Sequence, residues 1–349
     1  MSKDHFVAQT YLKHFGDLKT GGMLHAYRKT DGAEFPCWPK DSRCSQTWDR
    51  YVALPPIYKY LDVRGAKLTL SSGTFKHAKP SDFNDIEDLT IQSIFPEETE
   101  AALKKLSDGF TEVILQHLND RPTCSSPMRE KLALIQQVYR TNPKAAQLVK
   151  AGLGKEGGAP IYDMGYMRER SKQFIDEINE FMQGYRILCV TTHKDSERMW
   201  SVYAETHKGI ALRIEPNVTK DSKFQLFRPV EYRKERPPLY NDTLDFIADS
   251  LFGDQEARRK EIIEKIVYSK TLSWQHEGEY RLAIPILNSE PPWNTLKYHP
   301  EEITELYLGC AMQQADKEDI VSNAKVLNPE IAIFQAVRGA DTKLTFQRI

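Results

Sequence analysis

The segment 274–284 alternates between apolar and charged positions with the period of two that is typical of a β-strand. One face carries the apolar side chains of Tyr280, Leu282 and Ile284. The opposite face carries the charged side chains of Glu277, Glu279 and Arg281. Glutamate is a poor strand former, so two glutamates and an arginine on one face need an explanation. The pattern indicates either an edge strand with a solvated row of salt bridges or a functional site.

Elsewhere the chain switches between strand-like and helix-like patterns. Short apolar or alternating runs predict strands over 57–61, 68–71, 187–190, 209–214, 229–232, 304–308 and 331–334. Apolar residues at helical spacing predict helices over 97–118, 127–140, 167–182, 242–265 and 317–325. Residues 96–183 therefore form a helical insertion between stranded regions, and the predicted fold class is α+β, with a strand-built core and peripheral helices.

The first 50 residues are predicted to be a separate extension. An N-terminal helix or turn is followed by turn signals at 20–22 and 30–32, and the alternating run 23–28 between them predicts one strand of a small hairpin. Residues 51–349 then form the main domain, which includes the helical insertion.

Composition narrows the classes of function. The 349 residues carry a net charge of -1 and are 40% hydrophobic. A protein that binds nucleic acid through bulk electrostatics is usually basic, so this balance excludes that class but permits an enzyme that touches nucleic acid locally. No stretch approaches the ~18 apolar residues of a membrane helix, and the start lacks the features of a signal peptide. We therefore expect a cytoplasmic protein without a membrane partner.

Metal and disulfide chemistry find little support in the sequence. The five cysteines include no C-x-x-C pair, and the nine histidines show no metal-ligand spacing. Free thiols and no metal centre are expected. Phosphate-loop, dinucleotide-fingerprint and serine-hydrolase motifs are also missing from the sequence.

Two further motifs carry candidate chemistry. Residues 196–204 predict a short helix that directly follows a strand, and Trp200 and Tyr203 would share one of its faces. Such a pair anchors a core or offers a stacking platform to a planar ring. The second motif is the polar turn Phe83-Asn84-Asp85, whose side chains often bond only to their own backbone.

Three motifs occur together and in a fixed order: Phe83-Asn84-Asp85, then Met199-Trp200-x-x-Tyr203 with Lys208-Gly209, then Trp274-x-x-Glu277-x-Glu279-Tyr280-Arg281. The ordered set resembles a widespread bacterial domain family of unassigned function, over about residues 57–335 apart from the insertion. That domain in turn resembles the ADP-ribosyltransferases, including toxins that modify nucleic acid. Residues 5–15 resemble the start of a second uncharacterised bacterial family, which is found near defence genes.

The resemblance implies a split β-sheet core, NAD as a substrate and a set of roles for named residues. In the ADP-ribosyltransferases an early strand residue holds NAD, an aromatic residue stacks on nicotinamide, and a glutamate on a late strand is catalytic. The matching positions are Tyr58, Lys59 and Tyr60 on the early strand, Trp200 or Tyr203 for stacking, and Glu279. Asn84 and Asp85 complete the expected NAD-binding set.

The chemistry of this reaction suits these residue types. Breaking the bond between nicotinamide and ribose builds positive charge on the ribose, which a carboxylate such as Glu279 stabilises. Glu277 would orient or deprotonate the acceptor. Arg281 would hold a diphosphate oxygen or pin Glu279.

We therefore expect an NAD-dependent ADP-ribosyltransferase that acts as an antiviral toxin in bacteria. Its acceptor is expected to be nucleic acid, RNA more than DNA, and an antitoxin or chaperone is a possible protein partner. Two alternatives remain open. One is a non-catalytic binding or sensor module of a bacterial defence system. The other is a metal-dependent nuclease that uses Asp85, Glu277 and Glu279 as metal ligands.

Overall fold

A computed structural model describes residues 54–349 except 143, 145–163, 218–219, 221, 254, 286–294 and 340–342. Before residue 54 it describes four short strands: β1 (Asp4–His5), β2 (Leu24–Tyr27), β3 (Glu34–Cys37) and β4 (Ser45–Gln46). The predicted hairpin is confirmed, because β2 pairs antiparallel with β3, and β1 pairs with β4. The N-terminal helix or turn that we predicted lies almost wholly outside the described residues.

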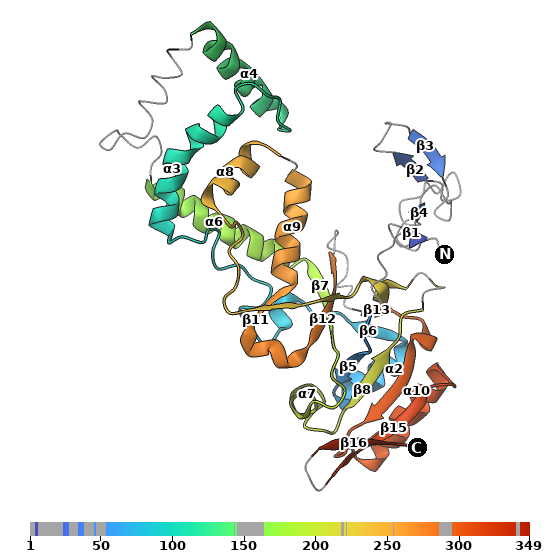
Figure 1. Cartoon of the computed structure of the whole chain (residues 1–349). Coiled ribbons are helices and arrows are strands. Elements are labelled where there is room, and N and C mark those ends of the chain that lie inside the picture. Colours follow the sequence, from blue (N-terminus) through green and yellow to red (C-terminus); the bar gives the residue numbers. More distant parts are fainter. Residues whose placement is uncertain are drawn as a thin grey trace.

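An eight-stranded mixed sheet forms the centre of the molecule (Figure 1). Its strand order is β16-β15-β14-β8-β5-β7-β12-β9. The strands are β5 (Ile57–Leu61), β7 (Tyr185–Thr191), β8 (Ile210–Ile214), β9 (Arg228–Pro229), β12 (Glu279–Pro285), β14 (Ile303–Leu308), β15 (Ala332–Arg338) and β16 (Leu344–Arg348). Within the described part of this sheet, only β14 and β15 pair in parallel. The predicted α+β class is confirmed.

Strands β5 and β7 pair over a much shorter length than the other neighbouring strands at the centre of the sheet. These two strands share a single registered pair, Tyr58 with Thr191. By contrast, β5 pairs with β8 along its whole length, and β7 pairs with β12 along its whole length. The sheet therefore consists of two well-paired halves joined at one residue pair, and the site described below lies beside this junction.

Helices cover the sheet on both faces. On one face, α2 (Val63–Ser72) and α10 (Gln314–Leu327) bury Ala66, Leu70, Ile320 and Ala324 against the apolar side chains of β5, β8 and β14. On the other face, α7 (Glu197–Tyr203) packs Met199 and Trp200 against Tyr58 and Tyr60. These contacts fix α7 beside β5.

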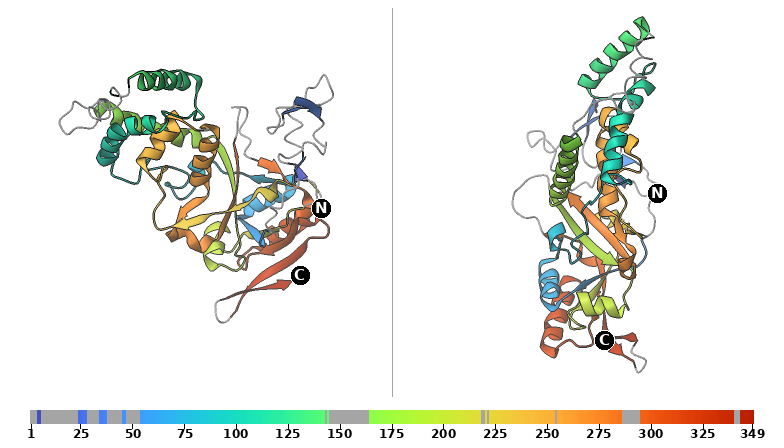
Figure 2. Two further views of the ribbon diagram at one scale, coloured as in Figure 1. Left: turned by 45° about the horizontal axis from the view of Figure 1, so that its top comes forward. Right: turned by 90° about the vertical axis from the view of Figure 1, so that its left-hand side faces the viewer.

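A second, mostly helical layer lies at the β7–β12 end of the molecule (Figure 2). It contains α3 (Thr99–Gln116), α4 (Ser126–Thr141), α6 (Met164–Met182), α8 (Thr243–Leu251) and α9 (Gln255–Val267). Its core joins Leu103 of α3 to Ile247 of α8 and Ile266 of α9. The helices within 96–183 therefore share one core with later helices.

Three predicted elements are wrong. The strand predicted over 229–232 is divided between β9 (Arg228–Pro229), which belongs to the large sheet, and β10 (Glu231–Arg233), which does not. Residues 68–71 are not a strand but the end of α2, which begins after Asp62 and ends at Gly73. The Asp62 carboxylate accepts a hydrogen bond from the Gly65 N–H, and Gly73 has a positive φ of 64°, so the helix has both of its caps. The single helix predicted over 242–265 is divided into α8 and α9 near Gly253, whose φ is 95°.

Small elements complete the described fold. Strand β6 (Thr74–Lys76) pairs with β13 (Thr295–Lys297), and β10 (Glu231–Arg233) pairs in parallel with β11 (Ser269–Thr271). Short 3₁₀ helices are η3 (Pro80–Asp82), η4 (Lys223–Leu226), η5 (Leu272–Glu277) and η6 (Pro300–Glu302). None of the helices in the described part of the chain combines the length and hydropathy that crossing a bilayer requires.

Candidate functional site

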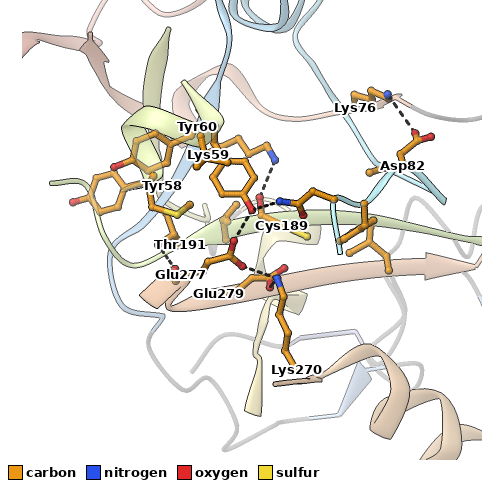
Figure 3. Close-up of a pocket in the computed structure, with 18 residues that line it drawn as sticks. Tyr58, Lys59, Tyr60, Lys76, Asp82, Cys189, Thr191, Lys270, Glu277 and Glu279 are labelled. Atoms are coloured by element: carbon orange, nitrogen blue, oxygen red, sulfur yellow. Dashed lines mark hydrogen bonds and ion pairs between the residues drawn. The ribbon is translucent and has the colours of Figure 1, made fainter. Parts of the chain in front are cut away.

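A cavity of about 320 Å³ opens beside the junction of β5 and β7 (Figure 3). It lies at the lower end of the size range of ligand pockets. Many of the residues singled out by sequence line it: Tyr58, Lys59, Tyr60, Asn84, Tyr203, Glu277 and Glu279. Residues far apart in the chain therefore meet in one pocket.

The two glutamates come together through a tight turn rather than through a continuous strand. The predicted strand over 277–284 begins only at Glu279, because η5 ends at Glu277 and Gly278 turns the backbone. Gly278 has a φ of 51°, and a Cβ there would lie 2.6 Å from the His193 Nε2 atom. A glycine is thus required at this position. The turn aims both carboxylates at the same cation.

That cation is Lys270 of β11. Its Nζ lies 2.6 Å from Glu277 Oε2 and 3.2 Å from Glu279 Oε2. It also lies 3.6 Å from Asp88 Oδ2. Lys270 is only 3% exposed, so it holds the three carboxylates together out of contact with bulk water.

Arg281 completes this buried cluster. Its Nε and Nη2 donate to Glu279 at 2.7 and 3.0 Å, and its Nη1 and Nη2 donate to Asp88 at 3.0 and 2.5 Å. Both contacts are bidentate, which is the geometry that guanidinium–carboxylate pairs favour. The solvated row of salt bridges that we considered is wrong, because Glu277, Glu279 and Arg281 are all buried.

The electrostatics of the cluster keep Glu279 and Lys270 charged. Burial alone would raise the pKa of Glu279, but Arg281 and Lys270 outweigh burial and hold that pKa at about 2. Burial would likewise lower the pKa of Lys270, but Glu279, Asp88 and Glu277 outweigh it and raise that pKa. Three carboxylates face Lys270 and Arg281 in this cluster, and Lys59 also lines the pocket.

Tyr203 connects the cluster to the polar turn. Its hydroxyl donates to Glu277 Oε1 at 2.5 Å and accepts from Asn84 Nδ2 at 3.2 Å. Burial and the acceptor Glu277 raise the pKa of Tyr203, so its proton stays on the phenol and points to the carboxylate. The Phe83-Asn84-Asp85 turn is thus tied to the site by a side chain.

Lys59 is a second cation at the pocket. Among the described residues its Nζ donates one hydrogen bond, to the Cys189 carbonyl oxygen at 3.0 Å, and pairs with no carboxylate. Burial lowers its pKa. The third lysine at the pocket, Lys76, pairs with Asp82 at 3.4 Å. Lys59 is therefore the pocket cation with donors to spare.

Three of the predicted site residues do not line the cavity. Trp200 is fully buried, stacks edge-on against Tyr60 and donates from Nε1 to the Lys194 carbonyl oxygen, as a core anchor does. Asp85 lies 3.6 Å from Arg236 and accepts from the Glu87 N–H. Arg281 is fully buried and contacts Glu279, so it takes the pinning arrangement of the two that the sequence left open.

Two members of the cluster were missed by sequence analysis. Lys270 lies in a short strand just before the Trp274 motif, and Asp88 lies five positions after Phe83. Neither position belongs to a periodic pattern. The only signal was their nearness in sequence to the two motifs.

A metal site finds no support in the described residues, which contain no group of three His, Cys, Asp or Glu side chains arranged to hold an ion. The Lys270 ammonium lies between the two glutamates, where it neutralises the charge that would attract a cation. Asp85, the third ligand of the nuclease alternative, does not line the pocket.

Comparison with known families matches part of the chain. Residues 199–282 match the model of a family described as a protein of unknown function (DUF2971). The match spans Tyr203, Lys270 and both glutamates, and it agrees with the resemblance of the second and third motifs to an uncharacterised family. It indicates no relationship to the ADP-ribosyltransferases. No curated protein and no solved structure matches the chain.

Proposed function

We propose that this chain is an NAD-dependent ADP-ribosyltransferase that modifies nucleic acid, RNA in preference to DNA. The observation that carries the proposal is the pair of buried glutamates at a tyrosine-walled pocket beside the junction of β5 and β7. The pocket is open enough to admit a ligand. The ion-paired side chains beside it are held in place, so they would not need to move during the reaction.

The charge of the cluster suits the cleavage of a glycosidic bond. As nicotinamide leaves, positive charge develops on the ribose. The Glu277 and Glu279 carboxylates beside the pocket would favour that charge, and fixed, water-excluded charges act most strongly there. The glutamate that lies next to the acceptor group would remove the proton of that group.

The walls of the pocket suit the other parts of NAD. Tyr58, Tyr60 and Tyr203 offer aromatic surface to a planar ring. Lys59 has spare donors for a phosphate oxygen. A cavity of about 320 Å³ takes one end of the dinucleotide, so the other end would extend over the surface.

The wider biological setting belongs to the same proposal. Residues 5–15 resemble a family that is found near defence genes, and a nucleic-acid-modifying transferase of that kind would act as an antiviral toxin in the bacterial cytoplasm. Such an enzyme needs restraint in uninfected cells, so an antitoxin or chaperone is the partner to look for.

The test is a transfer assay. Purified protein is incubated with NAD labelled in the adenylate part and with total RNA, DNA or protein, and the label in each pool is measured. We expect labelled RNA, and loss of labelling in the double variant Glu277→Gln/Glu279→Gln. Glu301→Gln, which changes an exposed acid paired with Lys220, is the matched control.

The same assay separates the alternatives. No labelled pool with folded wild-type protein means that the transferase proposal is wrong. NAD binding in a calorimeter without any transfer indicates a binding module instead. Nucleic-acid cleavage that a chelator abolishes indicates a nuclease.

A further inference from the structure

We propose that Glu277, not Glu279, is the carboxylate that contacts the substrate, and that it accepts hydrogen bonds from the hydroxyls of a ribose. The inference rests on the proposed function for the identity of the substrate. It follows from counting which oxygen lone pairs at the site are already in use.

Glu279 has no acceptor capacity left on one of its two oxygens. A carboxylate offers about four lone-pair sites. Arg281 fills two of them, with Nε on Oε1 at 2.7 Å and Nη2 on Oε2 at 3.0 Å. Lys270 donates to Oε2 at 3.2 Å, so both sites of Oε2 are filled. A vicinal diol could bond to both oxygens of Glu279 only by displacing Lys270 or Arg281.

Glu277 keeps acceptor capacity on both oxygens. Tyr203 donates to Oε1 at 2.5 Å and Lys270 donates to Oε2 at 2.6 Å. The described residues supply no further side-chain donor to it. One lone pair per oxygen is thus free, and a vicinal diol can give one O–H to each oxygen.

The neighbours of Glu277 fix the position of its carboxylate and its backbone. Asn84 orients the Tyr203 hydroxyl, and Tyr203 in turn points its proton at Glu277. The Thr191 hydroxyl donates to the Glu277 carbonyl oxygen at 2.5 Å and fixes its backbone. The carboxylate therefore loses little freedom when a ligand binds, which favours affinity.

The first experiment measures affinity while one side chain of the protein and the hydroxyls of the ligand are each removed, as in a double-mutant cycle. NAD and an analogue that lacks the hydroxyls of the nicotinamide ribose are titrated by calorimetry into wild type, Glu277→Gln and the control Glu301→Gln. A hydrogen bond to a charged group corresponds to roughly 10- to 100-fold in affinity. We expect Glu277→Gln to weaken NAD by that factor, to leave the analogue nearly unchanged, and Glu301→Gln to change neither.

Equal weakening of NAD and analogue by Glu277→Gln would overturn the inference, since the lost contact would not be to a hydroxyl. Unchanged binding of NAD would overturn it too. A thermal melt of each variant shows that it is folded before its affinity is compared.

The second experiment needs neither NAD nor a variant. Wild-type protein is treated with a water-soluble carbodiimide and an amine, and labelled carboxylates are mapped by mass spectrometry. Both carboxylates line the pocket but are almost fully buried, and only Glu279 is also held by Arg281, so we expect Glu277 to be labelled faster than Glu279. An unlabelled Glu277, or Glu279 labelled in preference, would overturn the inference. A wild-type protein that binds no NAD but labels at Glu277 would contradict the proposed function alone.

Discussion

Replacing Lys270 by methionine removes the cation that three carboxylates share and keeps a side chain of similar length. Lys270 is 3% exposed and lies 2.6 Å from Glu277, 3.2 Å from Glu279 and 3.6 Å from Asp88. Arg281 still pairs with Glu279 and Asp88 in the variant. Glu277 is therefore the carboxylate that is left without a charged partner.

Removing one partner of a buried ion pair costs roughly 3–5 kcal/mol, because the other charge is left without compensation. A change of 1 kcal/mol shifts the Tm of a domain of 150–250 residues by about 2–4 °C. We therefore expect Lys270→Met to lower the Tm by roughly 10 °C at pH 7, measured by differential scanning fluorimetry and circular dichroism.

The loss has a defined pH dependence. In wild type the pKa of Glu279 is held at about 2, below its value in an unfolded chain, so this pairing stabilises the fold above about pH 4 and is lost as pH falls toward 2. Without Lys270 the buried carboxylates bind a proton more readily. The deficit relative to wild type is therefore expected to be larger at pH 8 than at pH 5.

Lys67→Met is the matched control, because Lys67 pairs with Asp316 and Asp319 in a more exposed position. Its Tm is expected to stay close to that of wild type. A Lys270→Met protein that melts within about 2 °C of wild type at pH 7, or whose deficit does not change with pH, would refute the buried-cluster reasoning.

The remaining predictions concern the turn, a buried histidine and the tyrosine relay. Gly278→Ala is expected to lower stability by roughly 1–3 kcal/mol, seen as a lower Tm, since φ is 51° and the new Cβ meets His193. Burial lowers the pKa of His77 to about 4, so its contribution to stability is present above pH 6.5 and is lost as pH falls to 4; His77→Phe should flatten the Tm profile over that range. Tyr203→Phe removes the donor to Glu277 and is expected to weaken NAD binding by roughly three- to tenfold and to lower the Tm less than Lys270→Met does; an unchanged Kd would contradict the relay.

Local patterns predicted most of the elements, because periodicity and capping are properties of neighbouring residues. The strand over 57–61 and the helices over 97–118, 127–140 and 167–182 agree with β5, α3, α4 and α6. The wrong strand prediction over 68–71 has the same cause, because a local pattern takes account of neighbouring residues alone. Four alternating residues look like a strand, but the caps at Asp62 and Gly73 lie outside that window and set a helix.

The opening motif shows where local reasoning ends. Alternation placed Glu277 and Glu279 on one face of a strand, whereas Gly278 turns the chain between them and ends that strand. The motif thus identified the right pair of acids for a partly wrong structural reason. It gave preference to Glu279, which the tertiary structure surrounds with donors.

The sequence by itself determined the α+β class, the order of most elements and the acids, tyrosines and turn that meet at the pocket. Only the tertiary structure decided which of them are free to act. Asp88 and Arg281 are 193 positions apart, and Tyr203 and Glu277 are 74 apart. A side chain's hydrogen-bond partners depend on which distant segments pack beside it, and no local pattern records that packing.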